Sequence, residues 1–223
     1  MILIQQKYET HNELRSWELE QARDLNKKSN LFKDIIDVSS KDNSKLTYQD
    51  LFNVSKGLND IIVLANTDIS FDNSLNLVAN ILDNNMIIAL SRWNNNSCPS
   101  MEGTVDKLTC SLFSHSQDAW IFRSDTLSAF NKNFILGIAS CENRLLYEAY
   151  CSGVKIINPA LDIIVRHHHS SLNTNYPSKY IGRFLFPKLT NINYSTEALV
   201  EANGQRYRVN TDTSHFQKLK III

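Results

Sequence analysis

Side chains that could bind a metal ion follow an apolar run. The run Ile61–Ala65 is uninterrupted and rich in β-branched residues, which is typical of a strand covered on both faces. It ends at Asn66-Thr67-Asp68, and Asp72 follows closely. In open α/β sheets ligands bind beyond the carboxyl ends of strands, so Asp68 is placed to receive a hard divalent cation that bridges to a pyrophosphate. An ordinary Asn/Asp turn is the alternative interpretation.

Three successive histidines, His167, His168 and His169, follow the apolar segment 154–165. If this segment is a strand, successive side chains point to opposite faces. We therefore expect His167 and His169 on one side and His168 on the other. A strand end that is simply solvated is the other interpretation of such a run.

An acid stands at the start of a predicted helix. Glu142 opens the helical pattern Glu142–Cys151 behind a loop that contains Gly137, and Gly153 has the position typical of a helix end. The helix dipole favours an anion in the first turn. A structural cap is therefore one interpretation of Glu142, and a reacting carboxylate is the other.

Two further side chains flank predicted strands. Arg92 follows the apolar run 86–90, where its guanidinium could bind a diphosphate through two nitrogens or form a surface ion pair. Asp118 precedes the strand-like run 119–122, which contains Trp120. An acid beside an aromatic ring is a common way to hold a sugar, and a place in the core is the alternative for Trp120.

Composition indicates a soluble globular protein. The chain has 223 residues, a formal net charge of zero, 43% hydrophobic and 21% charged residues. Zero net charge argues against non-specific nucleic-acid binding. No apolar run approaches the ~20 residues that cross a bilayer, and no leader pattern opens the chain, so we expect a cytoplasmic protein without a transmembrane segment. No C-x-x-C spacing relates the cysteines, which predicts free thiols at Cys98, Cys110, Cys141 and Cys151.

The elements that must position these side chains alternate between strand and helix. Apolar runs predict strands at 1–4, 31–38, 61–65, 86–90, 119–122 and 154–165, the last in two halves around Asn158-Pro159. Helical spacing predicts helices from Asn12, from Thr47, from Asn73 or Ser74, and over Glu142–Cys151. The first is amphipathic, and its apolar residues are Leu14, Trp17, Leu19, Ala22 and Leu25. Residues 94–103 have no strong pattern and are expected to form a mobile flap.

In their order these features resemble glycosyltransferases of the GT-A class. The triplet Asn66-Thr67-Asp68 is similar to the Asp-x-Asp motif of that class, with Asn66 where the first Asp usually stands. Glu142-Asn143 is similar to the Glu-Asp pair that opens a late helix in the same class. The resemblance covers roughly Met1 to Ser171.

The resemblance implies a fold and a set of site residues. Residues 1–171 would form a GT-A-like (Rossmann-like) open mixed sheet with helices on both faces, and residues 172–223 a C-terminal appendage. Mn²⁺ or Mg²⁺ would be bound by Asp68 and by a late histidine at the rim of the sheet, His167 or His169, since imidazole suits Mn²⁺ beside carboxylate and phosphate oxygen. The nucleotide-diphosphate sugar would contact Asn66, Asp68 and Arg92. Glu142 would be the general base, with Asp118 as the alternative.

The function implied is a hexosyl-type glycosyltransferase. It would move a sugar from a nucleotide-diphosphate sugar to a hydroxyl acceptor such as a glycan, with divalent-metal assistance. A metal-dependent phosphoesterase or nucleotide hydrolase could use the same Asp and His residues. An inactive sugar- or nucleotide-binding module is the third alternative, because Asn66 and Asn143 replace two acids.

Overall fold

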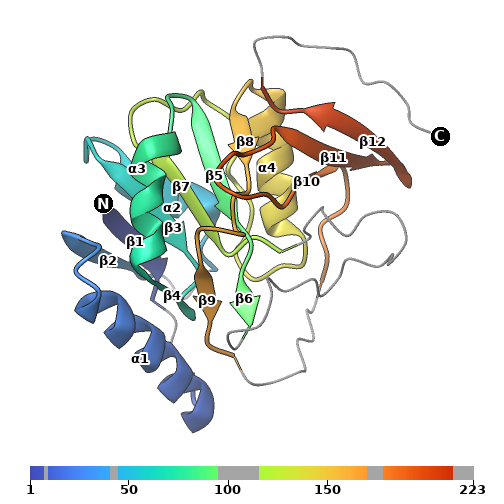
Figure 1. Cartoon of the computed structure of the whole chain (residues 1–223). Helices are drawn as coiled ribbons and strands as arrows, with labels where there is room; N and C mark the ends of the chain where they lie inside the picture. The colour runs from blue at the N-terminus through green and yellow to red at the C-terminus, as the bar shows by residue number, and fades with distance from the viewer. Residues whose placement is uncertain (8–9, 41–44, 95–115, 170–177, 213–223) are drawn as a thin grey trace.

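Six strands of the described residues form an open, mixed sheet. The computed structural model describes residues 1–7, 10–40, 45–94, 116–169 and 178–212. The strand order in the sheet (Figure 1) is β2 (Asp34–Val38), β1 (Ile2–Gln6), β3 (Ile61–Ala65), β7 (Ala119–Arg123), β5 (Met86–Leu90) and β8 (Lys155–Ile157). Only β7 of these strands runs against its neighbours.

The reversed strand β7 brings its amino end to the edge where its neighbours end. Ala119 is level with Ala65 of β3 and with Leu90 of β5. The ladder continues by one residue, since the Asn66 amide donates to the Asp118 carbonyl at 3.0 Å and the Asp118 amide donates to the Leu90 carbonyl at 3.0 Å. Residues that follow β1, β3 and β5, or precede β7, therefore meet at one edge, which we call the carboxyl rim.

Helices cover both faces of this sheet. Alternate side chains such as Ile62 and Leu64 pack on one face against α2 (Tyr48–Ser55) and α4 (Cys141–Cys151). Val63 and Ala65 pack on the other face against η1 (Asn73–Leu77) and α3 (Val78–Ile81). The two-residue period of the strands makes both cores possible, because every second side chain points to the same face. The expected α/β class, with helices on both faces of a mixed sheet, is confirmed.

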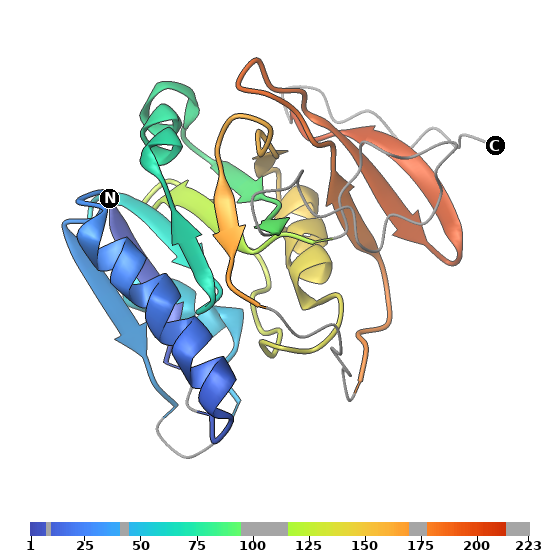
Figure 2. The same ribbon diagram turned by 60° about the horizontal axis from the view of Figure 1, so that its bottom comes forward.

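A small sheet lies at the carboxyl rim and consists of β4 (Ile69–Phe71), β9 (Val165–His167) and β6 (Trp93–Asn94) in that order within the described chain (Figure 2). The strand β4 begins only four residues after β3 ends, and it pairs antiparallel with β9. The expected strand over 154–165 is thus divided between sheets, since β8 joins the large sheet and β9 the small one.

Helix α1 (Glu13–Lys28) packs against β4 through polar contacts. The Asn26 side chain donates to the Ile69 carbonyl at 2.8 Å and accepts from the Phe71 amide at 3.1 Å. This docking turns Leu14 and Trp17 outward, and each is 57% exposed. The expected apolar face of the helix is therefore only partly buried, and the buried side chains are Glu18, Leu19, Ala22 and Asn26.

Three antiparallel strands follow in the last described segment, in a region where the sequence pattern predicts no element. They are β10 (Phe184–Pro187), β11 (Glu197–Ala202) and β12 (Gln205–Asn210). Figure 1 shows them beside α4, and Leu185 and Val200 belong to the same core cluster as that helix. The domain boundary expected after residue 171 lies at 170–177, outside the described residues.

Other expectations have mixed outcomes. The helix expected from Asn73 or Ser74 is a 3-10 helix, η1, followed by the short α3. Cys141 and Cys151 are free thiols, whereas Cys98 and Cys110 lie outside the described residues. Apart from Asn94, the expected flap also lies outside them. No helix in the described ranges is long and apolar enough to span a membrane.

Candidate metal centre and active site

Asp68, His167 and His169 meet at the carboxyl rim. Each offers one possible ligand atom, and these atoms all lie within 4.8 Å of one another. The Oδ2 atom of Asp68 is 3.1 Å from Nε2 of His167. The sequence-based candidates for metal ligands are thus brought together from positions about a hundred residues apart.

The pairing of β4 with β9 produces this arrangement. Ile69 lies opposite His167, and the His168 amide donates to the Asp68 carbonyl at 2.8 Å. The His168 ring is directed elsewhere, because its Nε2 atom lies 2.7 Å from the Ser70 hydroxyl. The alternation expected for the three histidines is therefore present in the structure.

The donor set fits a divalent cation. Two ligands bound to one ion at a right angle, each about 2.1 Å away, are about 3 Å apart. The 3.1 Å separation between Asp68 Oδ2 and His167 Nε2 agrees with that value. One carboxylate and two imidazoles suit Mn²⁺ better than Mg²⁺, which prefers oxygen alone. Such a set also leaves coordination positions for phosphate oxygens.

A positive side chain already contacts the Asp68 carboxylate. Arg15, in the first turn of α1, donates from Nη2 to Asp68 Oδ2 at 2.5 Å. Burial alone would raise the pKa of Asp68, but the hydrogen bond with His167 and the charges of His167 and Arg15 outweigh it and hold that pKa well below its usual range. Asp68 is therefore ionised, as a metal ligand must be.

A second polar cluster surrounds Asp118 at the same rim. Its carboxylate accepts hydrogen bonds from Asn66 Nδ2 at 2.6 Å, from the Ser116 hydroxyl at 2.9 Å and from Arg92 Nη1 at 3.4 Å. Asp118 is buried, and these donors satisfy it. Asn66, the first residue of the triplet, is thus committed to Asp118 in this structure.

Glu142 lies near this cluster, in the first turn of α4. It accepts a hydrogen bond from the Cys141 thiol at 3.2 Å. Burial raises the pKa of Glu142 to about 7, and the negative charge of Asp118 acts in the same direction. A carboxylate with a pKa near neutrality is suited to general acid–base catalysis.

Asn143, which follows Glu142, has a structural role. Its buried Nδ2 atom donates to Gln117 Oε1 at 2.9 Å and to the Leu185 carbonyl at 3.1 Å. The side chain therefore ties α4 to the strand β10 and to the segment before β7. The absence of an acid at this position leaves Glu142 as the acid of the pair.

The structure decides the roles of two further residues. Trp120 is 1% exposed and packs edge-to-face against Tyr48 with ring centroids 5.0 Å apart, so it belongs to the core and cannot hold a sugar. Asp72 does not join Asp68, because the strand β4 separates them. Its carboxylate instead accepts from the amide and hydroxyl of Ser74 and pairs with Arg166.

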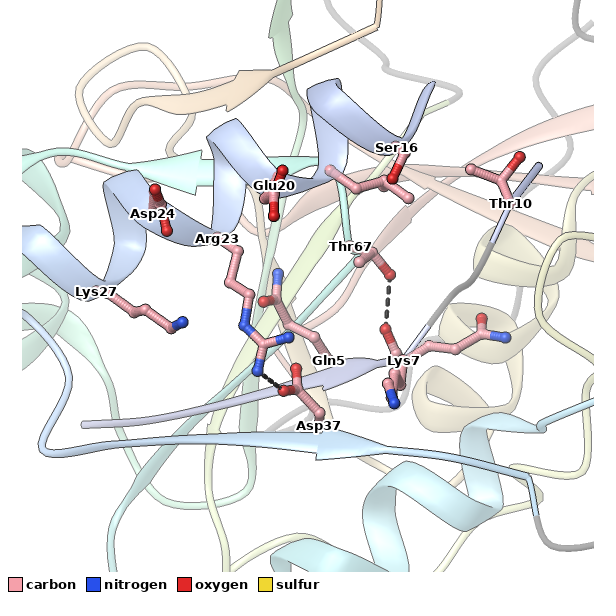
Figure 3. Close-up of a pocket in the computed structure, with 12 residues that line it drawn as sticks. Gln5, Lys7, Thr10, Ser16, Glu20, Arg23, Asp24, Lys27, Asp37 and Thr67 are labelled. Carbon is pink, nitrogen blue, oxygen red and sulfur yellow. Dashed lines mark hydrogen bonds and ion pairs between the residues drawn. The ribbon is translucent and has the colours of Figure 1, made fainter. Parts of the chain in front are cut away.

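A polar pocket of about 380 Å³ opens between α1 and the carboxyl ends of β1 and β2 (Figure 3). Arg23 of α1 crosses the space to form an ion pair with Asp37 of β2. Thr67 lines the opposite part and donates to the Gln6 carbonyl at 2.8 Å. The volume is within the usual range for small-molecule sites. Because Thr67 precedes Asp68, the pocket adjoins the candidate metal centre.

Comparison with known proteins adds nothing to this geometry. No family model matches the chain, and no curated protein or solved structure matches it.

Three residues near this site were not singled out from the sequence, and only two of them have a signal in it. Thr67 and Gln5, which both line the pocket, follow predicted strands, so their place on the carboxyl rim could have been inferred. Arg15 is different, because it is one of several charged residues on an amphipathic helix. No local signal distinguishes the residue that contacts Asp68.

Proposed function

We propose that this protein is a metal-dependent glycosyltransferase of GT-A type, which moves a sugar from a nucleotide-diphosphate sugar to a hydroxyl acceptor. The observation that carries the proposal is the convergence of Asp68, His167 and His169 beside a polar pocket at the carboxyl rim. A nucleoside in that pocket would extend its diphosphate past Thr67 towards Asp68. This is the arrangement that a nucleotide-diphosphate donor requires.

The described residues divide the work between two clusters. Asp68, His167 and His169 would hold a divalent cation, Mn²⁺ or Mg²⁺, which supplies Lewis-acid stabilisation of the departing nucleoside diphosphate. Arg92, in the second cluster, carries a positive charge at the rim and is held by Asp118 at 3.4 Å. It would bind the diphosphate or the sugar from that side.

Glu142 is the better candidate for the general base that deprotonates the acceptor hydroxyl. Asp118 accepts three hydrogen bonds, from Asn66, Ser116 and Arg92, so its carboxylate oxygens already have other partners. Glu142 has a pKa raised to about 7, so it can take a proton near neutral pH. Asp118 would then position Arg92, and its negative charge would help to raise the pKa of Glu142.

Release of the nucleoside diphosphate tests the proposal. Purified protein is incubated with a panel of UDP- and GDP-sugars, with Mn²⁺ or with EDTA, and with or without oligosaccharide acceptors. We expect Mn²⁺-dependent release of UDP or GDP that an acceptor stimulates. Release of inorganic phosphate instead would indicate a phosphoesterase, and tight nucleotide binding without turnover would indicate a binding module.

The Asp68→Asn variant provides the matched control. Asn keeps the shape of the side chain but is a weaker metal ligand. We expect Mn²⁺-dependent nucleotide binding to be lost while the melting temperature shows that the protein is folded. Unchanged nucleotide affinity in the presence of Mn²⁺ would exclude the metal centre.

A further inference from the structure

Arg15 connects the candidate metal centre with helix α1. Its backbone amide donates to the side chain of Asn12, the N-cap of the helix, at 3.0 Å, so the first turn is fixed. Its guanidinium contacts Asp68 Oδ2 at 2.5 Å, Glu18 Oε2 at 3.0 Å and the His168 carbonyl at 3.2 Å. One side chain thus bridges two acids and the strand that carries the histidines.

The two acids need a positive partner. Asp68 is 7% exposed and Glu18 is 5% exposed. An ionised carboxylate at such depth is stable only when it is paired. Arg15 meets this need for both, and its contacts with them raise the pKa of Arg15 although burial opposes the shift.

The same carboxylate oxygen is required by a divalent cation. Oδ2 of Asp68 receives Arg15 and also faces His167 Nε2 at 3.1 Å, the separation expected for two ligands of one ion. A divalent cation bound there would lie within a few ångströms of the guanidinium, and like charges at that distance repel strongly in a buried site. Arg15 and the cation therefore compete for Asp68.

The donor offers Arg15 a second partner. Ser16 and Glu20, on the same helix, line the polar pocket, and so does Thr67, the residue before Asp68. The Arg15 guanidinium contacts Asp68, whose chain neighbour Thr67 lines the pocket, so a diphosphate that reached from the pocket to Asp68 would approach this guanidinium. The planar fork of arginine binds phosphate oxygens through two parallel hydrogen bonds.

We propose that Arg15 is a latch on this site: it neutralises Asp68 until a divalent cation takes that carboxylate, and it then binds the diphosphate of the donor. This inference rests on the proposed function, because it assumes a nucleoside-diphosphate donor. It makes cation and donor binding cooperative, since the cation releases the group that the donor needs.

Titration calorimetry with Mn²⁺ alone tests the first half. Arg15→Gln removes the competing charge, so Mn²⁺ affinity should rise by about 5- to 150-fold, the usual range of coupling between two sites. Lys28→Gln is the matched control, because it removes one positive charge from the exposed last turn of the same helix and should leave Mn²⁺ affinity unchanged. An Arg15→Gln protein with equal or weaker Mn²⁺ affinity would show that Arg15 only orients Asp68, and the latch would be excluded.

Titration with UDP and GDP in saturating Mn²⁺ tests the second half. Arg15→Gln should bind the nucleoside diphosphate at least about tenfold more weakly, because a charge-assisted contact is lost. Opposite changes in the two affinities are the signature of the latch, whereas a purely structural role would lower both. If Arg15→Gln binds Mn²⁺ more tightly but binds the nucleotide as the wild type does, Arg15 does not bind the diphosphate and the proposal is wrong.

Arg15→Lys is a second variant, which keeps the proposal testable if Arg15→Gln does not fold. Lysine keeps the charge beside Asp68 and Glu18 but lacks the fork, so Mn²⁺ affinity should stay near that of the wild type while nucleotide affinity falls. Wild-type nucleotide affinity in this variant would also overturn the proposal. If the wild-type protein binds neither Mn²⁺ nor nucleotide, the proposed function itself fails; if it binds both and Arg15→Gln matches it, the latch alone fails.

Discussion

At the scale of single residues, the amide at Asn66 has a physical explanation. Its Nδ2 atom lies 2.6 Å from the Asp118 carboxylate, which is buried. A carboxylate at position 66 would place a second negative charge against Asp118 and would remove the hydrogen bond that Asn66 donates. Asparagine in the first position of the triplet therefore donates to Asp118, and Asp68 remains as the candidate metal ligand.

The variant Asn66→Asp tests this explanation. It replaces a donor by a second carboxylate, so we expect the free energy of unfolding to fall by about 1–3 kcal/mol. Urea denaturation of both proteins at neutral pH measures the difference. Asn76→Asp, at an exposed position, is the control and should change stability little. Equal stability of Asn66→Asp and wild type would mean that the contact with Asp118 is not formed.

The proposed role of Glu142 as general base can also be tested at this scale. Glu142→Gln keeps the size of the side chain but cannot accept a proton, so turnover should fall by ~10²–10⁴-fold with donor affinity preserved. Because the pKa of Glu142 is raised to about 7, wild-type turnover should increase as the pH rises through that value. Steady-state kinetics between pH 5 and 9 give both results. Near-normal turnover of the variant would transfer the role to Asp118 or indicate a retaining mechanism.

Stability against pH separates a base from a helix cap by an independent route. Folding raises the pKa of Glu142 from 4.5 to about 7, so the folded state binds its proton more tightly than the unfolded state. This contribution to stability is complete below about pH 4.5 and is lost as the pH rises through about 7. Glu142→Gln lacks it, so the variant should gain stability relative to wild type between pH 5 and pH 8. A cap would show the reverse, because the dipole favours the ionised form.

At the scale of elements, the pairing of β4 with β9 decides which histidines can bind a cation. His167 and His169 share a side with Asp68, whereas the ring of His168 reaches Ser70 at 2.7 Å. The small sheet therefore positions the residues of the candidate metal centre. Its strands come from three distant parts of the chain.

Alanine variants of the three histidines test this frame. Loss of His167 or His169 should weaken Mn²⁺ binding by at least about tenfold, since even residues behind the ligands contribute that much. His168→Ala should keep the Mn²⁺ affinity and lose about 1 kcal/mol of stability with its hydrogen bond to Ser70. Calorimetric titration and thermal denaturation report the two quantities. Three variants with the same Mn²⁺ affinity would contradict the alternation along β9.

At the scale of the whole molecule, β10–β12 complete a core that the large sheet cannot close alone. Leu185 and Val200 are fully buried in the cluster that also contains Trp120 and Leu145 of α4. Asn143 adds a buried hydrogen bond from α4 to the Leu185 carbonyl. These strands therefore stabilise the helix that carries Glu142.

Leu185→Ala tests this dependence. Truncation of a buried leucine leaves a cavity and should cost about 2–5 kcal/mol. If the core is shared, tryptophan fluorescence and far-UV circular dichroism should detect a single transition that shifts to a lower temperature. Ile181→Ala, where the side chain is 94% exposed, is the control. A separate early transition with the main transition unchanged would show that β10–β12 unfold independently.

Local patterns in the sequence determined much of the large sheet. Short runs rich in β-branched residues, such as Ile61–Ala65, favour a buried strand, and Asn12 and Thr47 cap their helices through short-range hydrogen bonds. The period of two residues likewise predicted the opposite directions of His167 and His168. These features depend only on neighbours along the chain, so one sequence is enough to infer them.

Tertiary structure alone decided which distant groups meet. Nothing local indicates that β4 pairs with β9, that Arg15 contacts Asp68, or that Asn66 donates to Asp118. The outward side of α1 is another case, because Asn26 docks the helix on β4 and leaves Leu14 and Trp17 exposed. Periodicity shows that a side chain is apolar or charged, but its partner is chosen by packing between elements far apart in sequence. The candidate metal ligands could therefore be named from the sequence, whereas Arg15, the positively charged side chain that contacts one of them, could not.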